Sequence, residues 1–196
     1  MPKRAIVLLA DGFEEVEAAT PITYLRRAGI EVTTAAVTEK AQQSQNLTVN
    51  GARGIQMNAD TVLSKLSNSY DAVIVPGGMP GAANLAASKE VSSLLKEMAA
   101  SCRLVCAICA SPAVVLAPLG LLAGKKFTCF TGMEEKAKES AASCGCVWSE
   151  DRVVTDGNII TSRSAGTAGE FSIAIISSLL GEEDAKKVAE TVLLNI

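Results

Sequence analysis

The sequence predicts an α/β fold built on a mostly parallel sheet with helices on both faces. Short, uninterrupted apolar runs such as Ala5 to Leu9 and Asp71 to Val75 are typical of strands buried on both faces. Stretches with a helical pattern follow these runs, and strands that alternate with helices form parallel sheets. The 196 residues, 48% of them hydrophobic, can bury one full core, so we expect a single domain over residues 1–196.

The N-terminal part is expected to begin with a βα unit. The strand Ala5 to Leu9 is ended by Asp11-Gly12, and the helix Glu14 to Ala28 ends at Gly29, a residue typical of helix C-termini. Next come a strand rich in β-branched residues, Glu31 to Val37, and a polar surface loop, Thr38 to Asn46. Leu47 to Asn50 and Gly54 to Met57 then form either a hairpin or two separate short strands.

The rest of the chain repeats this alternation. After the strand Asp71 to Val75, Pro76-Gly77-Gly78 forms a turn and Ala82 to Ala100 is mostly helical. The next strand is Leu104 to Ile108, and a helix with proline in its first turn follows at Pro112 to Leu119. Arg152 to Thr155 and Ile159 to Ser162 form a hairpin. Two helices divided by Gly181 end the chain, Thr167 to Leu180 and Glu182 to Leu194.

Three loops are candidates for a single functional site. They follow the first strand, the strand that ends at Val75, and the strand that ends at Ile108: Asp11 to Glu17, Pro76 to Gly81, and Cys109 to Pro112. In sheets of this kind, ligands bind beyond the carboxyl ends of the strands.

Composition excludes several classes of function. The net charge is −3 and the basic residues are scattered, so no footprint for nucleic acid or an anionic membrane is visible. No apolar run approaches the roughly 20 residues of a membrane span, and Met1 to Arg4 leads into a strand rather than a signal peptide. We therefore expect a cytoplasmic protein that binds a small molecule or another protein.

Cys109 is the strongest candidate for a catalytic residue. It lies where an apolar strand meets Ala110-Ser111-Pro112 and a helical pattern begins. Such a corner exposes the side chain near a helix N-terminus, where N–H groups and the helix dipole favour a thiolate. The chain contains no histidine, so a group other than imidazole must activate Cys109.

The other cysteines are expected to be free thiols of a reducing compartment rather than a disulfide framework. They are Cys102, Cys106, Cys129, Cys144 and Cys146. Cys106 and Cys109 match the spacing of thioredoxin-like redox pairs, but Cys106 lies within a strand, where side chains three residues apart face opposite sides. Cys144-Gly145-Cys146 lacks a second pair at zinc-ligand spacing, so we expect no metal and no cofactor.

The chain resembles the ThiJ/PfpI superfamily, and most closely its DJ-one branch, which includes the Parkinson's-associated protein and its bacterial relatives. The segments that carry the resemblance are Ala10 to Glu17, Val75 to Gly78, Ala107 to Pro112 and Thr161 to Thr167. The likeness runs from Lys3 to the last helix. It implies a flavodoxin-like, three-layer α/β/α sandwich that is usually a homodimer.

The resemblance also implies roles for individual residues. Cys109 corresponds to the family's nucleophile and oxidation-sensitive cysteine, and Glu17 to the acid that hydrogen-bonds its sulfur. Gly78 and Ala110 would supply backbone N–H groups in the manner of an oxyanion hole. The residues expected to support this pair or to contact the substrate are Gly77, Arg53, Phe130, Arg163 and Ala165.

The chain departs from the family pattern at Phe130, which occupies the segment where many relatives keep a histidine. A protease-like triad is therefore not expected. Arg53 aligns with an arginine that some relatives place at the dimer interface near the site, and Arg163 lies in a segment that approaches the cysteine. By itself, either arginine is equally consistent with a surface charge.

Elementary chemistry supports the pairing of Glu17 with Cys109. Two like charges in a narrow site disfavour each other, so one group should hold a proton, and a protonated Glu17 can donate to sulfur and act as a general acid or base. Gly77-Gly78 would let the backbone approach a substrate carbonyl closely. The alternatives are a solvated helix face for Glu17 and an ordinary turn for the two glycines.

Two functions remain open. In the first, Cys109 adds to a 2-oxoaldehyde such as methylglyoxal or glyoxal, and Glu17 rearranges the adduct by proton transfer without a cofactor. This is the reaction of a glutathione-independent lyase of the glyoxalase III type, and the related deglycase would hydrolyse glycated side chains through the same adduct. In the second, Cys109 is oxidised to a sulfinic acid, and the protein is a redox sensor, with chaperone activity in oxidative stress.

Overall fold

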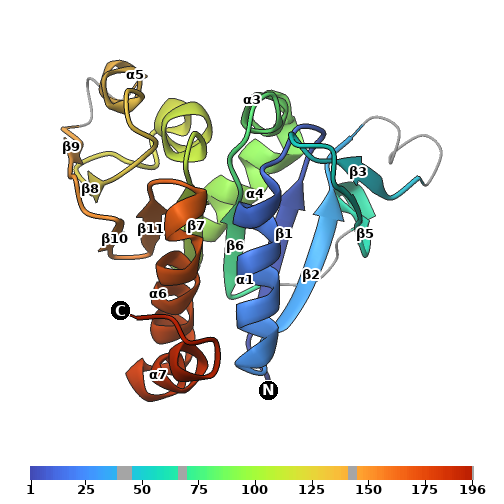
Figure 1. Ribbon diagram of the computed structural model, residues 1–196. Helices are drawn as coiled ribbons and strands as arrows, with labels where there is room; N and C mark the ends of the chain where they lie inside the picture. Colours follow the sequence, from blue (N-terminus) through green and yellow to red (C-terminus); the bar gives the residue numbers. More distant parts are fainter. Residues whose placement is uncertain (39–45, 66–69, 141–144, 196) are drawn as a thin grey trace.

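The computed structural model describes residues 1–38, 46–65, 70–140 and 145–195 and has a seven-stranded sheet at its centre (Figure 1). The strand order is β10-β11-β7-β6-β1-β2-β5, and every neighbouring pair is parallel except β10 with β11. The strands are β1 (Arg4–Leu9), β2 (Glu31–Ala36), β5 (Thr61–Val62), β6 (Ala72–Val75), β7 (Leu104–Ile108), β10 (Val153–Asp156) and β11 (Ile159–Ser162).

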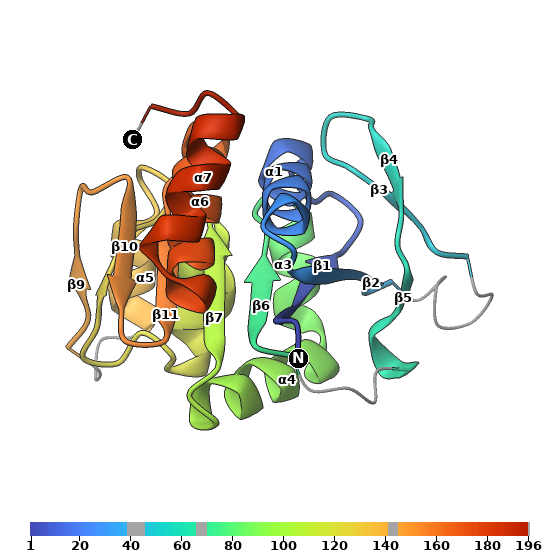
Figure 2. The same ribbon diagram turned by 90° about the horizontal axis from the view of Figure 1, so that it is seen from below.

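Helices cover both faces of this sheet, which confirms the predicted three-layer α/β/α fold. Figure 2 shows one set on one side of the strands and the other set on the opposite side. The first set is α1 (Glu15–Arg27), α6 (Ala168–Leu180) and α7 (Glu182–Thr191); the second is α3 (Gly81–Ala87) and α4 (Lys89–Ala100). None of the described helices is long and apolar enough to cross a bilayer.

The apolar strands are buried on both faces, as their composition predicts. In β1, Ile6 and Leu8 belong to the cluster beneath α3 and α4, whereas Ala5, Val7 and Leu9 belong to the cluster beneath α1 and α6. All five side chains are fully buried. The alternation follows from the two-residue period of a strand, and a one-residue slip would exchange the two faces.

Two small sheets lie outside the central one. β3 (Thr48–Asn50) pairs antiparallel with β4 (Gln56–Asn58), so the predicted hairpin forms, with its second strand two residues later than expected. β8 (Lys126–Phe127) pairs parallel with β9 (Val147–Trp148), and α5 (Glu134–Ser140) packs against the turn after β7; the sequence predicted none of these three. Within the predicted loop Thr38 to Asn46, residues 39–45 lie outside the described part of the chain.

Two predicted helices differ from the structure. The stretch Ala82 to Ala100 is divided at Ser88, which is extended and whose side chain accepts a hydrogen bond from the Val91 N–H as the N-cap of α4. The stretch Pro112 to Leu119 is a π-helical turn followed by a 3-10 turn. Pro118 lacks the N–H that a continuous α-helix needs there, and Gly120 at φ 73° ends the segment.

The predicted boundaries elsewhere lie within a few residues of those observed. α1 begins at Glu15 because the Glu14 side chain caps it, accepting a hydrogen bond from the Glu17 N–H at 2.7 Å. α7 ends at Thr191 rather than Leu194. Because β1, β6 and β7 are parallel, the loops that follow them meet at one edge of the sheet, at the end where α3 begins in Figure 1.

Candidate active site

Cys109 occupies the corner that the sequence predicted. It follows β7 directly and has φ 64°, a backbone conformation that residues other than glycine seldom adopt. Its N–H donates to the Ser162 carbonyl at 2.9 Å, and its own carbonyl accepts from the Phe130 N–H at 2.8 Å. Both backbone groups are therefore fixed by neighbouring segments, which hold the residue in this strained conformation.

Glu17 is buried in the first turn of α1, so a solvated helix face is excluded. Its side chain is 1% exposed, and Oε2 accepts a hydrogen bond from the Gly77 N–H at 2.8 Å. Oε1 is buried and has no hydrogen-bond partner of good geometry among the described residues. The Cys109 thiol and the Ala165 N–H interact with the same carboxyl group. The structure thus brings Glu17 and Cys109 together.

Gly77 lies between these two side chains. A Cβ at this position would be 2.6 Å from Glu17 Oε2 and 2.7 Å from the Cys109 Cβ, closer than real Cβ contacts come. Gly78, at φ 87°, would bring a Cβ against the backbone of Gly12, Phe13 and Glu14. The two glycines are therefore more than an ordinary turn, because they allow the strand-end loops to close around Cys109.

Burial sets the protonation of Glu17. It raises the pKa of this carboxyl from 4.5 to about 7; the hydrogen bond with Cys109 lowers the pKa, and the neighbouring Glu14 raises it. A buried Oε1 without a well-formed hydrogen bond is consistent with this direction, because a protonated oxygen can donate to the Cys109 sulfur. Near neutral pH Glu17 is therefore present in both forms.

Burial opposes the predicted preference for a thiolate at Cys109. Burial raises the pKa of the Cys109 thiol to about 12, and the charge of Glu17 raises it further, whereas N–H groups of Ala110 and Gly78 lower it. The two N–H groups act as expected, but burial and the like charge outweigh them. Because Glu17 repels a thiolate only when ionised, Cys109 loses its proton more readily while Glu17 keeps its own.

The outer predicted residues differ in how closely they approach the pair. Ala165 touches Glu17 through its N–H, and Phe130 touches Cys109 through its backbone. Arg163 is one step away: its Nη2 donates to Thr131 Oγ1 at 2.6 Å. Arg53 is exposed, and its backbone N–H donates to Glu15 Oε1 at 2.6 Å. The structure ties Arg53 to α1 by its backbone and brings no guanidinium to Cys109 within the described residues.

Three supporting residues were missed by the sequence analysis. Ser111 is fully buried and its hydroxyl donates to the Pro76 carbonyl at 2.6 Å, which joins the Cys109 corner to the glycine loop. Glu14 caps the helix that carries Glu17, and Glu15 holds the turn that carries Arg53. The spacing of Glu14 and Glu17, three residues apart at a helix start, was a capping signal in the sequence.

The cysteine three residues before Cys109 is inaccessible to solvent. Cys106 is fully buried within β7, in the cluster beneath α1 and α6, and burial raises the pKa of its thiol above the ordinary range. Cys144 lies outside the described residues. Among the residues that are described, no group of three or more His, Cys, Asp or Glu side chains could hold a metal ion.

Comparison with known proteins identifies the family. The sequence pattern of the DJ-1/PfpI family matches residues 3–178. Protein DJ-1 homolog A of Arabidopsis thaliana is 40% identical over 193 residues, which are 98% of this chain and 47% of that protein. The chain belongs to the DJ-1/PfpI family.

Two further relatives agree with this assignment. The glutathione-independent glyoxalase DJR-1.2 of Caenorhabditis elegans is 33% identical over 194 residues, 98% of this chain and 97% of that protein. The solved structure of Toxoplasma gondii DJ-1, oxidized, has a TM-score of 0.90 and 35% identity, and the match covers 99% of this chain and 100% of that one. The chain spans about half the length of the Arabidopsis relative and nearly all of these two.

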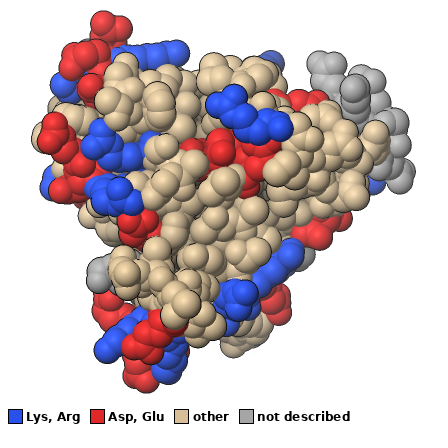
Figure 3. All heavy atoms as spheres, in the orientation of Figure 1, with Lys and Arg blue, Asp and Glu red and all other residues tan. Residues whose placement is uncertain are grey.

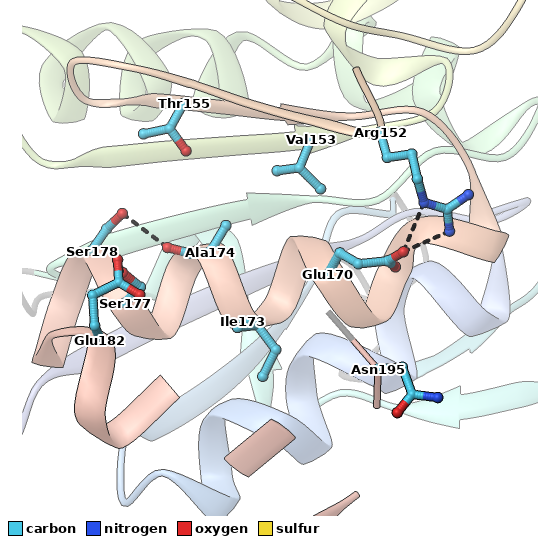
Figure 4. A pocket seen from close by; sticks show the side chains of 10 residues that line it. All are labelled: Arg152, Val153, Thr155, Glu170, Ile173, Ala174, Ser177, Ser178, Glu182 and Asn195. Carbon is cyan, nitrogen blue, oxygen red and sulfur yellow. Dashed lines mark hydrogen bonds and ion pairs between the residues drawn. The ribbon is translucent and has the colours of Figure 1, made fainter. Parts of the chain in front are cut away.

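A hollow in the surface of this DJ-1/PfpI chain lies away from the predicted site residues. It is a groove of about 780 Å³ beside β10 and α6, lined by Arg152, Val153, Thr155, Glu170, Ile173, Ala174, Ser177, Ser178, Glu182 and Asn195. Figure 4 shows Arg152 turned toward Glu170, and the Ser178 hydroxyl donates to the Ala174 carbonyl. Several of its charged and hydroxyl groups are engaged in hydrogen bonds or ion pairs, and neither Cys109 nor Glu17 lines it.

Charged side chains of both signs share the surface of the molecule. In Figure 3, acidic and basic side chains are interspersed over the face drawn, and the described residues form no extended area of basic charge there. A phosphate backbone or an anionic membrane would require such an area.

Proposed function

We propose that this chain is a cysteine-dependent, cofactor-independent enzyme that converts 2-oxoaldehydes such as methylglyoxal or glyoxal into 2-hydroxy acids. The observation that carries the proposal is the buried Glu17 carboxyl, with a pKa raised to about 7, in direct interaction with a cysteine held at φ 64°. A nucleophile beside a group that takes and returns protons near neutral pH is what this rearrangement requires. The name of the Caenorhabditis elegans relative, a glutathione-independent glyoxalase, supports it.

The first step is addition of sulfur to the aldehyde. The ionised form of Glu17 accepts the proton of the Cys109 thiol as sulfur attacks the aldehyde carbon and an S–C bond forms. The proton returns to the former carbonyl oxygen, so the product is a hemithioacetal and no net charge is created. The N–H groups of Gly78 and Ala110, which reach Cys109, would stabilise the developing oxyanion.

The second step moves a hydrogen between the two carbons. Glu17 removes the proton from the carbon attached to sulfur, and the electron pair passes through an enediol to the neighbouring carbonyl carbon, which is then protonated. The result is a thioester of the 2-hydroxy acid, and water hydrolyses it and restores the thiol. Since the chain contains no histidine, Glu17 performs the proton transfers without an imidazole partner.

Hydrolysis of glycated side chains would use the same adduct. An amine that has added to a 2-oxoaldehyde presents the same oxidation level to Cys109, and Glu17 can protonate the departing nitrogen. This deglycase reaction therefore needs no residue beyond those of the glyoxalase.

The second candidate function is a redox sensor. The observation that favours it is the convergence of the Gly78 and Ala110 N–H groups and the Glu17 carboxyl on one sulfur, because a sulfinate needs hydrogen-bond donors at its oxygens. The Toxoplasma gondii relative was solved in a form described as oxidized. We propose this role, with chaperone activity, as the alternative for the same site.

A steady-state assay of methylglyoxal loss without added glutathione separates the two functions. We expect turnover by the wild-type chain and none by Cys109→Ser, with most of it kept in Cys106→Ser, since Cys106 is buried within the sheet. In the wild type kcat/KM should rise with pH through about 7, as Glu17 ionises. Absence of turnover in the wild type would exclude the enzyme and leave the redox sensor as the proposed function.

The setting of this activity completes the proposal. We propose a small dicarbonyl or a glycated side chain as the substrate, a homodimer as the assembly, and the cytoplasm as the compartment. The reducing conditions of that compartment would keep Cys109 a thiol between turnovers.

A further inference from the structure

We propose that Phe130 and Met79 form an apolar rim that selects 2-oxoaldehydes carrying a large apolar or aromatic group over methylglyoxal. The proposal rests on the function proposed above and names its substrate class. The observation behind it is the exposure of these two side chains, which are 45% and 54% accessible. Each stands on a segment that contacts Cys109 through its backbone, so an apolar part of a substrate bound at Cys109 can reach it.

Phe130 is fixed next to the nucleophile. Its N–H donates to the Cys109 carbonyl at 2.8 Å, and its own carbonyl accepts from the Met133 N–H at 3.1 Å. The following residue, Thr131, is held by Arg163 at 2.6 Å. The Phe130 backbone is therefore held on both sides and is in contact with the Cys109 backbone.

Met79 stands on the other loop of the site. It follows Gly78, whose N–H reaches the Cys109 sulfur, and the Gly78 carbonyl accepts from the Ala82 N–H at 2.8 Å. The Gly77 carbonyl accepts from the Glu14 N–H at 3.0 Å. Methionine is flexible and polarisable, so it can adjust to a group of irregular shape and contact an aromatic edge.

The chemistry of the adduct leaves its substituent in the open part of the site. In a substrate R–CO–CHO the aldehyde carbon bonds to sulfur and the neighbouring carbon must meet Glu17. The inner side is closed, because Glu17 is 1% exposed and Gly77 has no room even for a Cβ. The group R therefore extends toward the exposed edge of the site, where the side chains of Phe130 and Met79 are available.

A rim of this composition discriminates by size and polarity. An aromatic R can stack on or meet the edge of Phe130 and contact the Met79 sulfur, whereas the methyl group of methylglyoxal reaches little of either surface. Neither side chain offers a charge or a hydrogen bond, so the rim gives no comparable gain to a carboxylate-bearing R.

The test compares two substrates in four proteins. We expect the ratio of kcat/KM for phenylglyoxal to that for methylglyoxal to fall roughly 2- to 12-fold in Phe130→Ala, and in the same direction in Met79→Ala, as for loss of an aromatic contact. Val147→Ala, which shortens an equally exposed side chain on β9, is the matched control and should leave the ratio unchanged. An unchanged ratio in both rim variants, with turnover retained, overturns the inference and leaves the proposed function standing.

A second readout keeps the inference testable if no substrate is turned over. Benzaldehyde and acetaldehyde add reversibly to a thiol, with the thiol proton passing to the carbonyl oxygen, but they lack the second carbonyl and cannot rearrange. Each should slow alkylation of Cys109 by iodoacetamide, and Phe130→Ala should weaken the protection by benzaldehyde more than that by acetaldehyde. Equal effects on both aldehydes would refute the rim, whatever the fate of the glyoxalase proposal.

Discussion

The reactivity of Cys109 depends on a proton that it shares with Glu17. Both groups are largely buried and burial raises both pKa values, so a state with two negative charges is disfavoured near neutral pH. The Glu17 carboxyl loses its proton first, and it can then accept the thiol proton during attack. This order makes the carboxyl, rather than a preformed thiolate, the controlling group of the site.

The two functions respond differently to changes at Glu17. Glu17→Gln keeps a hydrogen-bond donor but removes the transferable proton, so turnover should fall by roughly 10²-fold or more, the usual contribution of a general acid or base. Sulfinate formation should change less in this variant. In Glu17→Leu the donor is lost as well, and oxidation should stall at the sulfenic acid or pass on without a stable sulfinate.

Mass spectrometry after mild peroxide, read together with methylglyoxal kinetics, decides between these outcomes. Unchanged kinetics in Glu17→Gln would remove Glu17 as the catalytic acid and base. Unchanged sulfinate in Glu17→Leu would remove it as the partner of the oxidised sulfur.

The raised pKa of Glu17 also makes the stability of the fold depend on pH. The folded chain binds this proton more tightly than the unfolded chain, so its contribution is fully present below pH 4.5 and is lost as pH rises through about 7. The loss amounts to about 3 kcal/mol at pH 8. Glu17→Gln carries no such charge, so its melting temperature should exceed that of the wild type by a margin that grows between pH 5 and 8. A constant margin in calorimetry over this range would show that Glu17 titrates normally.

At the residue scale, the sequence indicated which residues lie together better than it indicated the pKa values of their side chains. Cys109 and Glu17 were found because a strand corner and a family motif mark them. The corner argument counted the N–H groups of Gly78 and Ala110, which lower the pKa of Cys109, but not burial by segments distant in sequence, which raises it. Arg53 is tied to α1 through its backbone N–H, and its expected place at a dimer interface near the site stays a prediction.

At the scale of the elements, the strands were the easiest to predict. β1, β6 and β7 are continuous apolar runs because both of their faces are covered, and this pattern is visible in the sequence. β8 and β9 have two residues each and carry too little periodicity to be recognised. The break at Ser88 and the π-helical turn after Cys109 depend on caps and proline positions that local propensity does not determine alone.

The glycine loop after β6 provides a test at this scale. Gly77→Ala should abolish turnover, because the added Cβ would lie 2.6 Å from Glu17 and 2.7 Å from Cys109 and must push the pair apart. Gly166→Ala is a demanding control, since it adjoins Ala165 yet its Cβ would meet nothing within 4 Å. Kinetics and circular dichroism of both variants check this. A folded and fully active Gly77→Ala would contradict the close packing of the pair.

At the scale of the whole molecule, the parallel sheet brings residues that are distant in the sequence together at one site. The strands β1, β6 and β7 point the same way. The segments that follow them, which are the first turn of α1, the loop after β6 and the corner after β7, therefore meet. The family resemblance predicted this type of fold from Lys3 to the last helix, and the DJ-1/PfpI match over residues 3–178 confirms the family. That residues 1–196 form a single domain stays a prediction.

The whole-molecule prediction concerns assembly, for which the exposed apolar residues beside α1 are the evidence. Val16, on the first turn of α1, is 48% exposed, and Ile55 is 60% exposed and bonded through its N–H to Glu15. Exposed apolar side chains on α1 and on a segment bonded to it favour burial in a C₂ interface that includes α1. Light scattering at micromolar concentration should therefore give twice the 20.3 kDa of the chain. Val16→Asp should shift the mass toward the monomer, because a charge would be buried at the interface, whereas Val147→Asp on β9 should not. A stable monomer in the wild type would exclude this dimer, and a dimer that withstands Val16→Asp would place the interface on another face.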